Sequence, residues 1–347
     1  MARGSGVSTA TVSRVMRDGA GFSAQTRDRV LQVAAELGWI PSGSARGLAS
    51  RRAGIVGLLF PDLGVGGPDS ESPLYVDQVI RGAEQAATAA GDAVLIAATR
   101  GSSGRDLALS VSSKVDGLVV VARSLPQADL ATLGRRLPVV VLSDRAGRLA
   151  EVDSVTVDNV GGMRALVDHL IEAHGYRDIT FIAGPPRSPD SSQRFAGYQQ
   201  AMRAAGLDAP KLPHAIGHFT EAGGARAARE LLADRRPPEA IVCGNDQMAI
   251  GTLDVLTSLR LRVPRHVAVT GFDDLAAARH VRPHLTTVAQ PMRDLGARAV
   301  RAVLARLDDP TAPRLESVLP TDLVVRRSCG CRPARRGAAG RSGRTAG

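Results

Sequence analysis

The stretch DITFIAGPPRSPDSSQRFAGYQQAMRAAG occupies residues 178–206 and decides the fold class, because it joins two kinds of hydrophobic pattern. Its first seven residues form a short apolar run that predicts a buried strand. Residues 192–206 repeat apolar side chains with the period of a helix and end in glycine. The same alternation recurs from Ala53 onward. It predicts an α/β fold built from parallel sheets with helices on both faces.

The alternating pattern covers most of the chain. Further apolar runs predict strands at 53–60, 92–99, 116–122, 137–143, 154–158, 240–245 and 267–273. Helix-period stretches lie between them at 76–91, 159–175, 221–234 and 246–259. So many units with such short links do not fit one small open sheet, so the core is either a barrel or two sheets side by side. In open α/β sheets, ligands bind beyond the carboxyl ends of the strands, which makes polar residues after strands the candidate site.

The first 50 residues contain no strand run and differ in kind from the rest. VSTATVSRVM (7–16) predicts an amphipathic helix capped by Ser8, and a second helix, capped by Ser23, ends at Gly38. The segment SGSARGLASRR (42–52) is too polar and glycine-rich to form a stable helix alone. We therefore expect a helical head at 1–41, a hinge or linker at 42–52, a core at 53–327 and a basic, disordered tail at 328–347.

The net charge of +10 is concentrated at the two ends of the chain. Residues 1–52 contain eight Arg and three acidic residues, and residues 326–347 contain seven Arg and no acidic residue. The body between them therefore carries a slight excess of negative charge. A basic head on a near-neutral body indicates a head that binds nucleic acid.

Several classes of protein are disfavoured by the composition. No apolar run approaches the roughly 20 residues that cross a bilayer, and the N-terminus lacks an apolar signal segment, so we expect a cytoplasmic protein without membrane contact. The three cysteines, Cys243, Cys329 and Cys331, are an odd number, and the last two lack the spacing or the histidine partners of a zinc site, which predicts reduced thiols and no metal. Neither a GxGxxG loop after the first strand nor a Ser–His–Asp or Cys–His set is evident, so we expect no enzyme and no cofactor.

Gly6-Val7-Ser8, followed by TATVSRV at 9–15, resembles the turn and recognition helix of the LacI family. The likeness continues through residues 23–27 and Trp39-Ile40-Pro41 into the hinge at 45–49, and the motifs of the core follow in the family's order. The resemblance implies a transcriptional repressor that binds double-stranded, palindromic operator DNA as a homodimer. A small-molecule effector, such as a sugar, a polyol or a nucleobase-like compound, would control it.

The resemblance also favours two sheets over a barrel. It implies two lobes joined by three crossovers, near 157–160, 286–291 and 316–320, as in periplasmic sugar-binding proteins. Lobe 1 would contain about 53–157 and 291–316, and lobe 2 about 158–288 and 318–327. A periplasmic binding protein would share this core, but it would need a signal peptide and would have no use for residues 7–49.

The expected DNA contacts follow from the resemblance and from the chemistry of the grooves. A helix in the major groove presents short side chains and one long donor, and we expect Arg14 to read a guanine. Ser23, Thr26 and Arg27 start a helix where they suit phosphates. In the hinge, Leu48 resembles the family's minor-groove wedge, and packing of Leu48 against the core is the alternative. The full set is Thr9, Ala10, Thr11, Ser13, Arg14, Ser23, Thr26, Arg27, Arg46 and Leu48.

The head departs from the family at its start. Members carry a longer first helix before the Gly-Val-Ser turn, whereas only Met1–Ser5 precede it here. One glycine-rich turn is too short to cover the inner face of the recognition helix, so we expect the head as written to be unstable and translation to begin upstream. The alternative is a true truncation with impaired DNA binding.

Four polar residues at strand ends match the family's effector contacts: Arg194, Asn245, Asp273 and Gln290. An arginine and an aspartate that face one ligand favour a neutral molecule rich in hydroxyl or amine groups, because either charge alone would be costly to bury. Tyr75 and Phe219 are candidates for an aromatic wall, with core packing as the alternative, and a further contact falls at Ser143 or Asp144. Asp158 and Asp246 are expected only to cap the helices that they begin.

Overall fold

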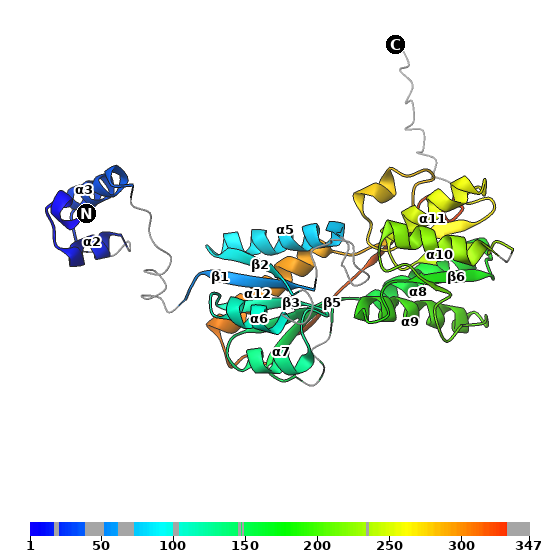
Figure 1. Cartoon of the computed structure of the whole chain (residues 1–347), viewed down its shortest axis with the longest axis horizontal. Coiled ribbons are helices and arrows are strands. Elements are labelled where there is room, and N and C mark those ends of the chain that lie inside the picture. The colour runs from blue at the N-terminus through cyan, green and yellow to red at the C-terminus, as the bar shows by residue number, and fades with distance from the viewer. Residues whose placement is uncertain are drawn as a thin grey trace, which may run out of the picture. The chain divides into compact units, whose positions relative to one another are not determined.

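The computed structural model describes residues 1–16, 21–38, 52–61, 73–99, 104–144, 147, 149–233 and 236–331. The chain falls into two compact units, Met1–Gly54 and Ile55–Gly347. Figure 1 shows a small helical unit, which we call the head, and a larger unit of helices and strands, which we call the core. Among the described helices, none is long and apolar enough to cross a membrane.

The head contains α1 (Ala2–Ser5), α2 (Thr9–Val15) and α3 (Ala24–Glu36). The two predicted caps are confirmed. The hydroxyl of Ser8 accepts a hydrogen bond from the backbone N–H of Thr11, and that of Ser23 accepts one from Thr26. Each cap satisfies one of the backbone donors that the first turn of a helix leaves without a partner.

The head has a small apolar core. Val12 and Val15 of α2 are buried with Val30 of α3, as the helical period predicts. Helix α1 is a single turn, yet Ser5 is completely buried and Met1 packs against the same cluster. The short turn thus covers part of the inner face that we expected it to leave open.

Lobe 1 of the core is a six-stranded parallel sheet in the order β11-β5-β4-β3-β1-β2. Its strands are β1 (Ile55–Phe60), β2 (Ala93–Ala98), β3 (Gly117–Val121), β4 (Val139–Leu142), β5 (Val152–Val157) and β11 (Glu316–Leu319). Leu58 packs with α5 (Pro73–Ala89) and α12 (Met292–Asp308), whereas Leu59 packs with α6 (Gly104–Ser112) and α7 (Gln127–Gly134). Successive side chains enter opposite layers, which is why the strand is apolar throughout.

Lobe 2 has a four-stranded parallel sheet in the order β7-β6-β8-β9. Its strands are β6 (Ile179–Ala183), β7 (Ala215–Ile216), β8 (Ala240–Cys243) and β9 (Ala268–Thr270). Phe181 packs with α8 (Asn159–His174) and α9 (Pro189–Ala204), and Ile182 packs with α10 (Glu221–Ala233) and α11 (Asp246–Ser258). A short 3-10 helix, η2 (Ala276–Arg279), follows β9.

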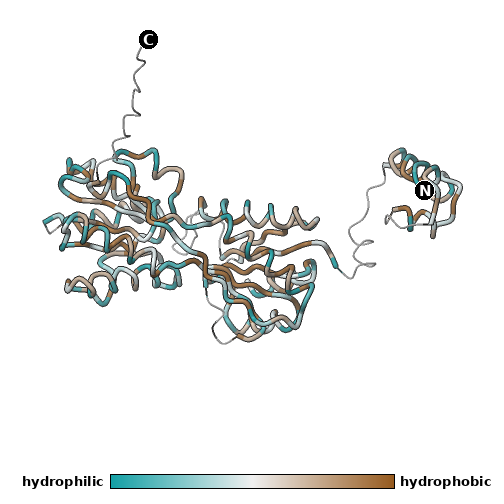
Figure 2. The backbone as a smooth tube through the Cα atoms, turned by 180° about the vertical axis from the view of Figure 1, so that it is seen from behind, coloured by the Kyte–Doolittle hydropathy of each residue, from teal (hydrophilic) through white to brown (hydrophobic). Residues whose placement is uncertain are grey.

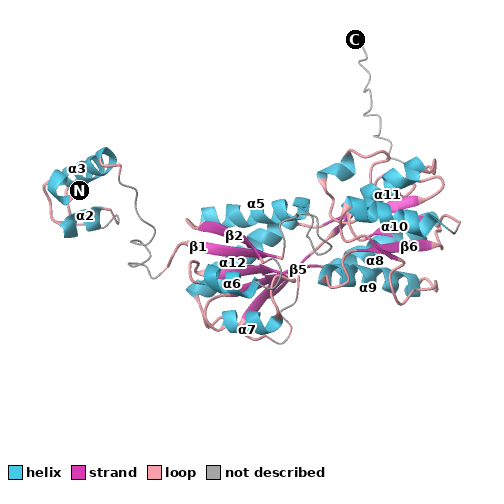
Figure 3. Cartoon of the chain, viewed as in Figure 1, coloured by secondary structure: helices cyan, strands magenta, loops and turns pink. Residues whose placement is uncertain are grey.

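The chain passes between the two lobes three times, after β5, after β10 (Thr287–Ala289), and between β11 and β12 (Asp322–Val324). Strands β10 and β12 pair antiparallel with each other. Figure 3 shows the helices on both faces of each sheet, and Figure 2 shows apolar segments along the strands inside each lobe. The two-lobed α/β fold is confirmed, and the alternative of a barrel is wrong.

The C-terminal boundary of the core lies further along the chain than we expected. Ser328 and Cys329 are completely buried, and the hydroxyl of Ser328 donates a hydrogen bond to the carbonyl oxygen of Val269 in β9. The assignment of residues 328–331 to a disordered tail is therefore wrong, because they pack against the sheet of lobe 2. The rest of the expected tail, 332–347, lies outside the described residues, as do hinge residues 42–51.

Helices α5 and α12 approach closely through glycine, which generates a prediction. A Cβ on Gly82 would overlap the carbonyl oxygen of Arg293. Gly82→Ala should therefore destabilise the core by about 1–3 kcal/mol, even though alanine favours a helix by about 1 kcal/mol relative to glycine. Urea unfolding of the full chain measures this. Gln85→Ala, at an exposed position of the same helix, should change stability by less than about 0.5 kcal/mol. A neutral or stabilising effect of Gly82→Ala would contradict the close packing.

Candidate functional site

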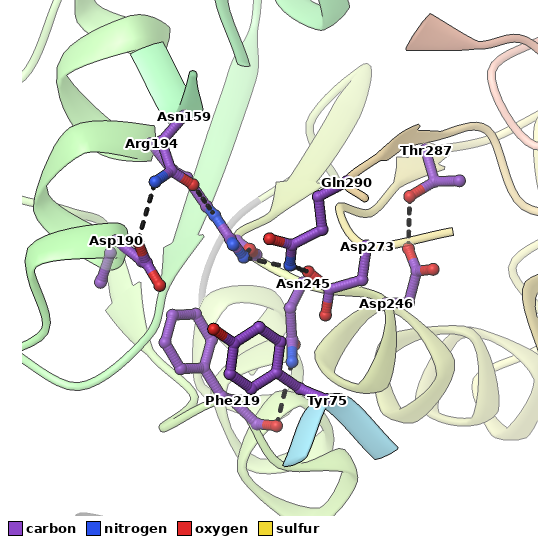
Figure 4. A network of polar contacts seen from close by, with 12 residues as sticks. Tyr75, Asn159, Asp190, Arg194, Phe219, Asn245, Asp246, Asp273, Thr287 and Gln290 are labelled. Atoms are coloured by element: carbon purple, nitrogen blue, oxygen red, sulfur yellow. Dashed lines mark hydrogen bonds and ion pairs between the residues drawn. The ribbon is translucent and has the colours of Figure 1, made fainter. Parts of the chain in front are cut away.

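Polar side chains converge beyond the carboxyl ends of the strands, at the boundary between the two lobes (Figure 4). They form a pocket lined by Tyr75, Asp190, Arg194, Phe219, Asn245, Asp273 and Gln290. Six of these residues are predicted by the sequence, and Asp190 is the exception. The free volume of the pocket is only about 20 Å³, which holds a water molecule but not a sugar ring. A larger ligand must therefore part the side chains.

Arg194 is the centre of the pocket. Its Nε donates to Asn159 Oδ1 at 2.8 Å, and its Nη1 donates to the carbonyl oxygen of Gly244 at 2.7 Å. Nη1 also lies 3.3 Å from Asp273 Oδ1, and the two side chains of this ion pair are only 3% and 4% exposed. The guanidinium carbon lies 3.9 Å from the centroid of the Phe272 ring. These contacts fix the orientation of the guanidinium plane before any ligand arrives.

Asp273 is held as firmly as its partner. Gln290 Nε2 donates to Asp273 Oδ1 at 2.6 Å, and the backbone N–H of Asp273 donates to the carbonyl oxygen of Val288 at 2.7 Å. The φ of Asp273 is 121°, a conformation that L-residues seldom adopt. Phe219 and Ser143 also have positive φ values, 59° and 62°. Backbone strain of this kind gathers at functional sites, where surrounding contacts must stabilise it.

Asn159 and Asp190 complete the network on the side of α8 and α9. Asn159 accepts from Arg194 through its carbonyl and donates through Nδ2 to Asp190 Oδ1 at 2.8 Å. The sequence offered one signal for Asn159, since it is a polar residue just after β5. Asp158 before it caps α8, as predicted, by accepting a hydrogen bond from the backbone N–H of Gly161 at 2.8 Å.

The start of α11 differs from the prediction. Asn245, not Asp246, is the cap: its Oδ1 accepts from the backbone N–H of Met248 at 3.0 Å, and its Nδ2 donates to the carbonyl oxygen of Phe219. Asp246 lies one residue inside the helix, so its carboxyl group turns inward and accepts from Leu275 N at 2.8 Å and from the Thr287 hydroxyl at 2.6 Å. Burial, together with the nearby Asp273 carboxylate, raises the pKa of Asp246 well above its usual range.

Each lobe contributes one aromatic side chain to the pocket, Tyr75 from lobe 1 and Phe219 from lobe 2. Tyr75 on α5 is buried, and its hydroxyl lies 2.6 Å from Ser143 Oγ, in the loop after β4. Phe219 faces Arg194, with 5.6 Å between the guanidinium carbon and the ring centroid. Of the two alternatives after β4, Ser143 contacts a pocket residue, whereas Asp144 is not among the described residues that line the pocket.

The predicted DNA contacts lie on the outer side of the head. Thr9, Ala10, Ser13 and Arg14 are exposed on α2, opposite its buried valines. Thr11 is partly buried and its hydroxyl lies 2.9 Å from that of Ser8, so it supports the helix cap. At the start of α3, Ser23 and Arg27 are exposed, and the Ser23 and Thr26 hydroxyls lie 3.0 Å apart. Arg46 and Leu48 lie outside the described residues.

Comparison with known proteins finds relatives for both the head and the core. The family model for bacterial regulatory proteins of the lacI family matches residues 1–42, and that for the periplasmic binding protein-like domain matches residues 167–329. The ribose operon repressor of Escherichia coli (strain K12) is 31% identical over 333 residues, covering 94% of this chain and 98% of the repressor. These matches confirm the prediction of a regulator and not an enzyme.

Two solved structures are similar to this chain over nearly its whole length. The lac repressor dimer bound to operator and the anti-inducer ONPF superposes with a TM-score of 0.83 at 27% identity, covering 94% of this chain and 97% of that one. The transcriptional regulator CelR in complex with cellobiose gives a TM-score of 0.71 at 31% identity, with coverage of 94% and 98%. Head and core therefore occur together in known DNA-binding regulators.

The raised pKa of Asp246 makes stability depend on pH in a defined direction. The native state keeps a proton that the unfolded chain releases once the pH exceeds the ordinary carboxyl range. The contribution of Asp246 to the free energy of unfolding is therefore fully present at low pH. It is lost as pH rises towards the raised pKa, by at most about 1.4 kcal/mol per pH unit. Asp246→Asn should remove this dependence, so that the variant gains stability relative to the wild type as pH rises.

Urea unfolding at a series of pH values measures the difference. Asp254→Asn, at an exposed position of the same helix, is the matched control and should run parallel to the wild type. A constant difference between Asp246→Asn and the wild type across the series would show that Asp246 is ionised in the folded protein.

Proposed function

The chain belongs to the LacI family of bacterial regulatory proteins, and we propose that it represses transcription as a homodimer on a palindromic operator under the control of a neutral, hydroxyl-rich effector. That it is a DNA-binding transcriptional regulator follows from the family. The oligomeric state, the symmetry of the operator and the chemistry of the effector are the steps that we add. We place its action in the cytoplasm, where the operator DNA lies.

The exposed face of α2 supports sequence-specific binding. Thr9, Ala10 and Ser13 are short enough to let the helix approach the base edges, and Arg14 is the long donor that can bind guanine O6 and N7 together. Ser23, Thr26 and Arg27 at the start of α3 would hold phosphates and set the register of α2 in the groove. Arg46 and Leu48 would contact the minor groove, as the resemblance of residues 45–49 to the hinge of the LacI family implies.

The edge of lobe 1 supports a homodimer. Strand β2 is the last strand of its sheet and consists only of apolar residues, among which Ile96 is exposed. Leu74, at the start of the neighbouring helix α5, is exposed as well. An uncovered apolar edge strand invites pairing with another chain. A second copy related by a two-fold axis would cover this edge and present two heads to two half-sites.

The buried Arg194–Asp273 pair is the observation that carries the effector assignment. The two groups face the pocket within 3.3 Å of each other, so their charges cancel locally. A charged ligand would leave one of them with a like-charged neighbour, whereas hydroxyl groups can accept from Arg194 and donate to Asp273. Tyr75 and Phe219 would stack on the apolar face of a ring. A sugar fits these demands best, and polyols and nucleobase-like compounds fit them in part.

Arg14 generates a prediction about the operator. Selection of DNA fragments on the full-length protein, followed by sequencing, should enrich a palindrome with two half-sites. Arg14→Ala should lose about 10–100-fold in discrimination at one base pair, at the symmetric position of both half-sites. Arg27→Ala is the control: it should weaken binding to all sequences alike and lower the slope of log affinity against log salt by about one. Selection that yields no palindrome would refute the proposed dimeric operator binding.

Arg194 and Asp273 generate a prediction about the effector. A thermal-shift screen of sugars, polyols and nucleobases should yield a ligand that raises the melting temperature of the wild type. Arg194→Lys and Asp273→Asn should each weaken that ligand at least about tenfold, because a hydrogen bond to a charged group contributes about 1.5–3 kcal/mol. Arg203→Lys, at an exposed position of α9, should bind it unchanged. A ligand that both pocket variants bind normally would refute the assigned pocket.

A further inference from the structure

Four side chains with metal-binding atoms meet at the far end of lobe 2. His169 and His174 come from the last turns of α8, and Cys329 and Cys331 follow β12. Helix α8 begins at Asn159, which contacts the pocket residue Arg194, and about 22 Å of helix separates His174 from Asn159, at about 1.5 Å per residue. The cluster is therefore distinct from the effector pocket, and no part of the proposed function uses it.

The four donor atoms surround a common point. They all lie within 4.8 Å of one another. The Sγ of Cys331 lies 3.6 Å from His169 Nε2 and 3.4 Å from His174 Nε2, and the Sγ of Cys329 lies 3.6 Å from His169 Nε2. A tetrahedral ion with Zn–S of about 2.3 Å and Zn–N of about 2.05 Å places its sulfur and nitrogen ligands about 3.6 Å apart. The observed separations match that value.

We propose that His169, His174, Cys329 and Cys331 form a structural zinc site. Two thiolates and two imidazoles in a tetrahedral arrangement are the donor set that Zn²⁺ prefers. With four protein ligands the site is closed, which is the mark of a structural site and leaves no position for a substrate. On binding, each thiol releases its proton to solvent as its sulfur bonds to the metal, and no electron is transferred.

The backbone between the cysteines is shaped for this approach. Gly330 has a φ of 113°, and a Cβ there would meet the His174 ring and the Tyr176 hydroxyl, each at 3.2 Å. Any other residue would strain the turn and push the cysteines away from α8. The Tyr176 hydroxyl also donates to the carbonyl oxygen of Cys329 at 3.0 Å, which holds the turn against the end of the helix.

The surroundings supply a hydrogen-bond donor to one of the two sulfur atoms. The Thr286 hydroxyl donates to the Sγ of Cys329 at 3.1 Å. Such a donor also stabilises a thiolate, and partners of this kind orient metal ligands in known sites.

The cluster corrects the expectation that the cysteines have no histidine partners. The sequence places Cys329 and Cys331 beside each other, but their partners lie more than 150 residues upstream, on a different element. His169 and His174 are five positions apart, which is a common spacing for two zinc ligands, but Cys329 and Cys331 have only one residue between them and come after the histidines instead of before them. Only the packing of the C-terminal segment against α8 brings the four side chains together.

The full-length chain, purified with a reductant, tests the site in two ways. Metal analysis after dialysis against Zn²⁺ should find one zinc ion per chain. Titration of the metal-free chain with Co²⁺ should produce the strong visible absorption of tetrahedral cobalt with thiolate ligands. Since the loss of one outer partner of a metal ligand already costs about 10–100-fold in affinity, Cys331→Ser and His174→Ala should each bind Zn²⁺ more than about 100-fold more weakly.

Matched controls separate the site from a general effect on folding. Cys243 lies in β8, and His280 lies on the surface. The variants Cys243→Ser and His280→Ala should therefore both keep one zinc ion per chain. The Co²⁺ titration of the wild type needs no variant, so it decides the question even if a variant fails to fold. A wild-type chain that gives no thiolate–cobalt absorption, or variants that keep their zinc, would overturn the proposal.

Discussion

An arginine and an aspartate pair where water is almost excluded, and the boundary between the two lobes is organised around them. Neither Arg194 nor Asp273 could be buried alone, since an uncompensated charge in such a place is strongly destabilising. Asn159, Gly244 and Gln290 supply the remaining hydrogen bonds that make the pair tolerable. The pair therefore contributes little to stability on its own account, but it fixes the positions of every group around it.

Two of those supporting groups, Asn159 and Gln290, lie on the segments that join the lobes. Asn159 follows the first crossover directly, and Gln290 lies in the second, just before α12. The third crossover runs beside the first, where the Thr321 hydroxyl donates to the carbonyl oxygen of Asp158 at 3.0 Å. A ligand that replaces the bonds between Arg194, Asp273 and Gln290 thus acts on the connections themselves. A switch between two states requires a ligand that contacts those states differently, and contacts on the crossovers meet this requirement. Small movements of the crossovers are enough to change the position of lobe 1.

Much of the fold was predictable because apolar runs report burial on both faces of a sheet. The strand at DITFIAG and the helix that holds Arg194 appear in the structure as β6 and α9. Four of the pocket residues were predictable because they lie at strand ends, which share one edge in a parallel sheet, and because they match effector contacts of the LacI family: Arg194, Asn245, Asp273 and Gln290. Pairwise contacts were not, since a sequence does not show that Asn159 meets Arg194 or that Asp246 turns inward to Thr287. The cluster of His169 with Cys331 was hidden for the same reason: it arises from contact between segments far apart in the chain.

The C-terminal segment gives the third crossover a fixed end. After β12 the chain enters the sheet of lobe 2, where the Ser328 hydroxyl donates to β9 and accepts from the backbone N–H of Thr286. Without a further bond, the segment after β12 would be held by a few hydrogen bonds and one buried cysteine. A metal that joins Cys329 and Cys331 to α8 would keep this segment attached to lobe 2. Any movement between the lobes would then be taken up by rotation within the crossovers, which keeps the geometry around Gln290 coupled to the relative position of the lobes.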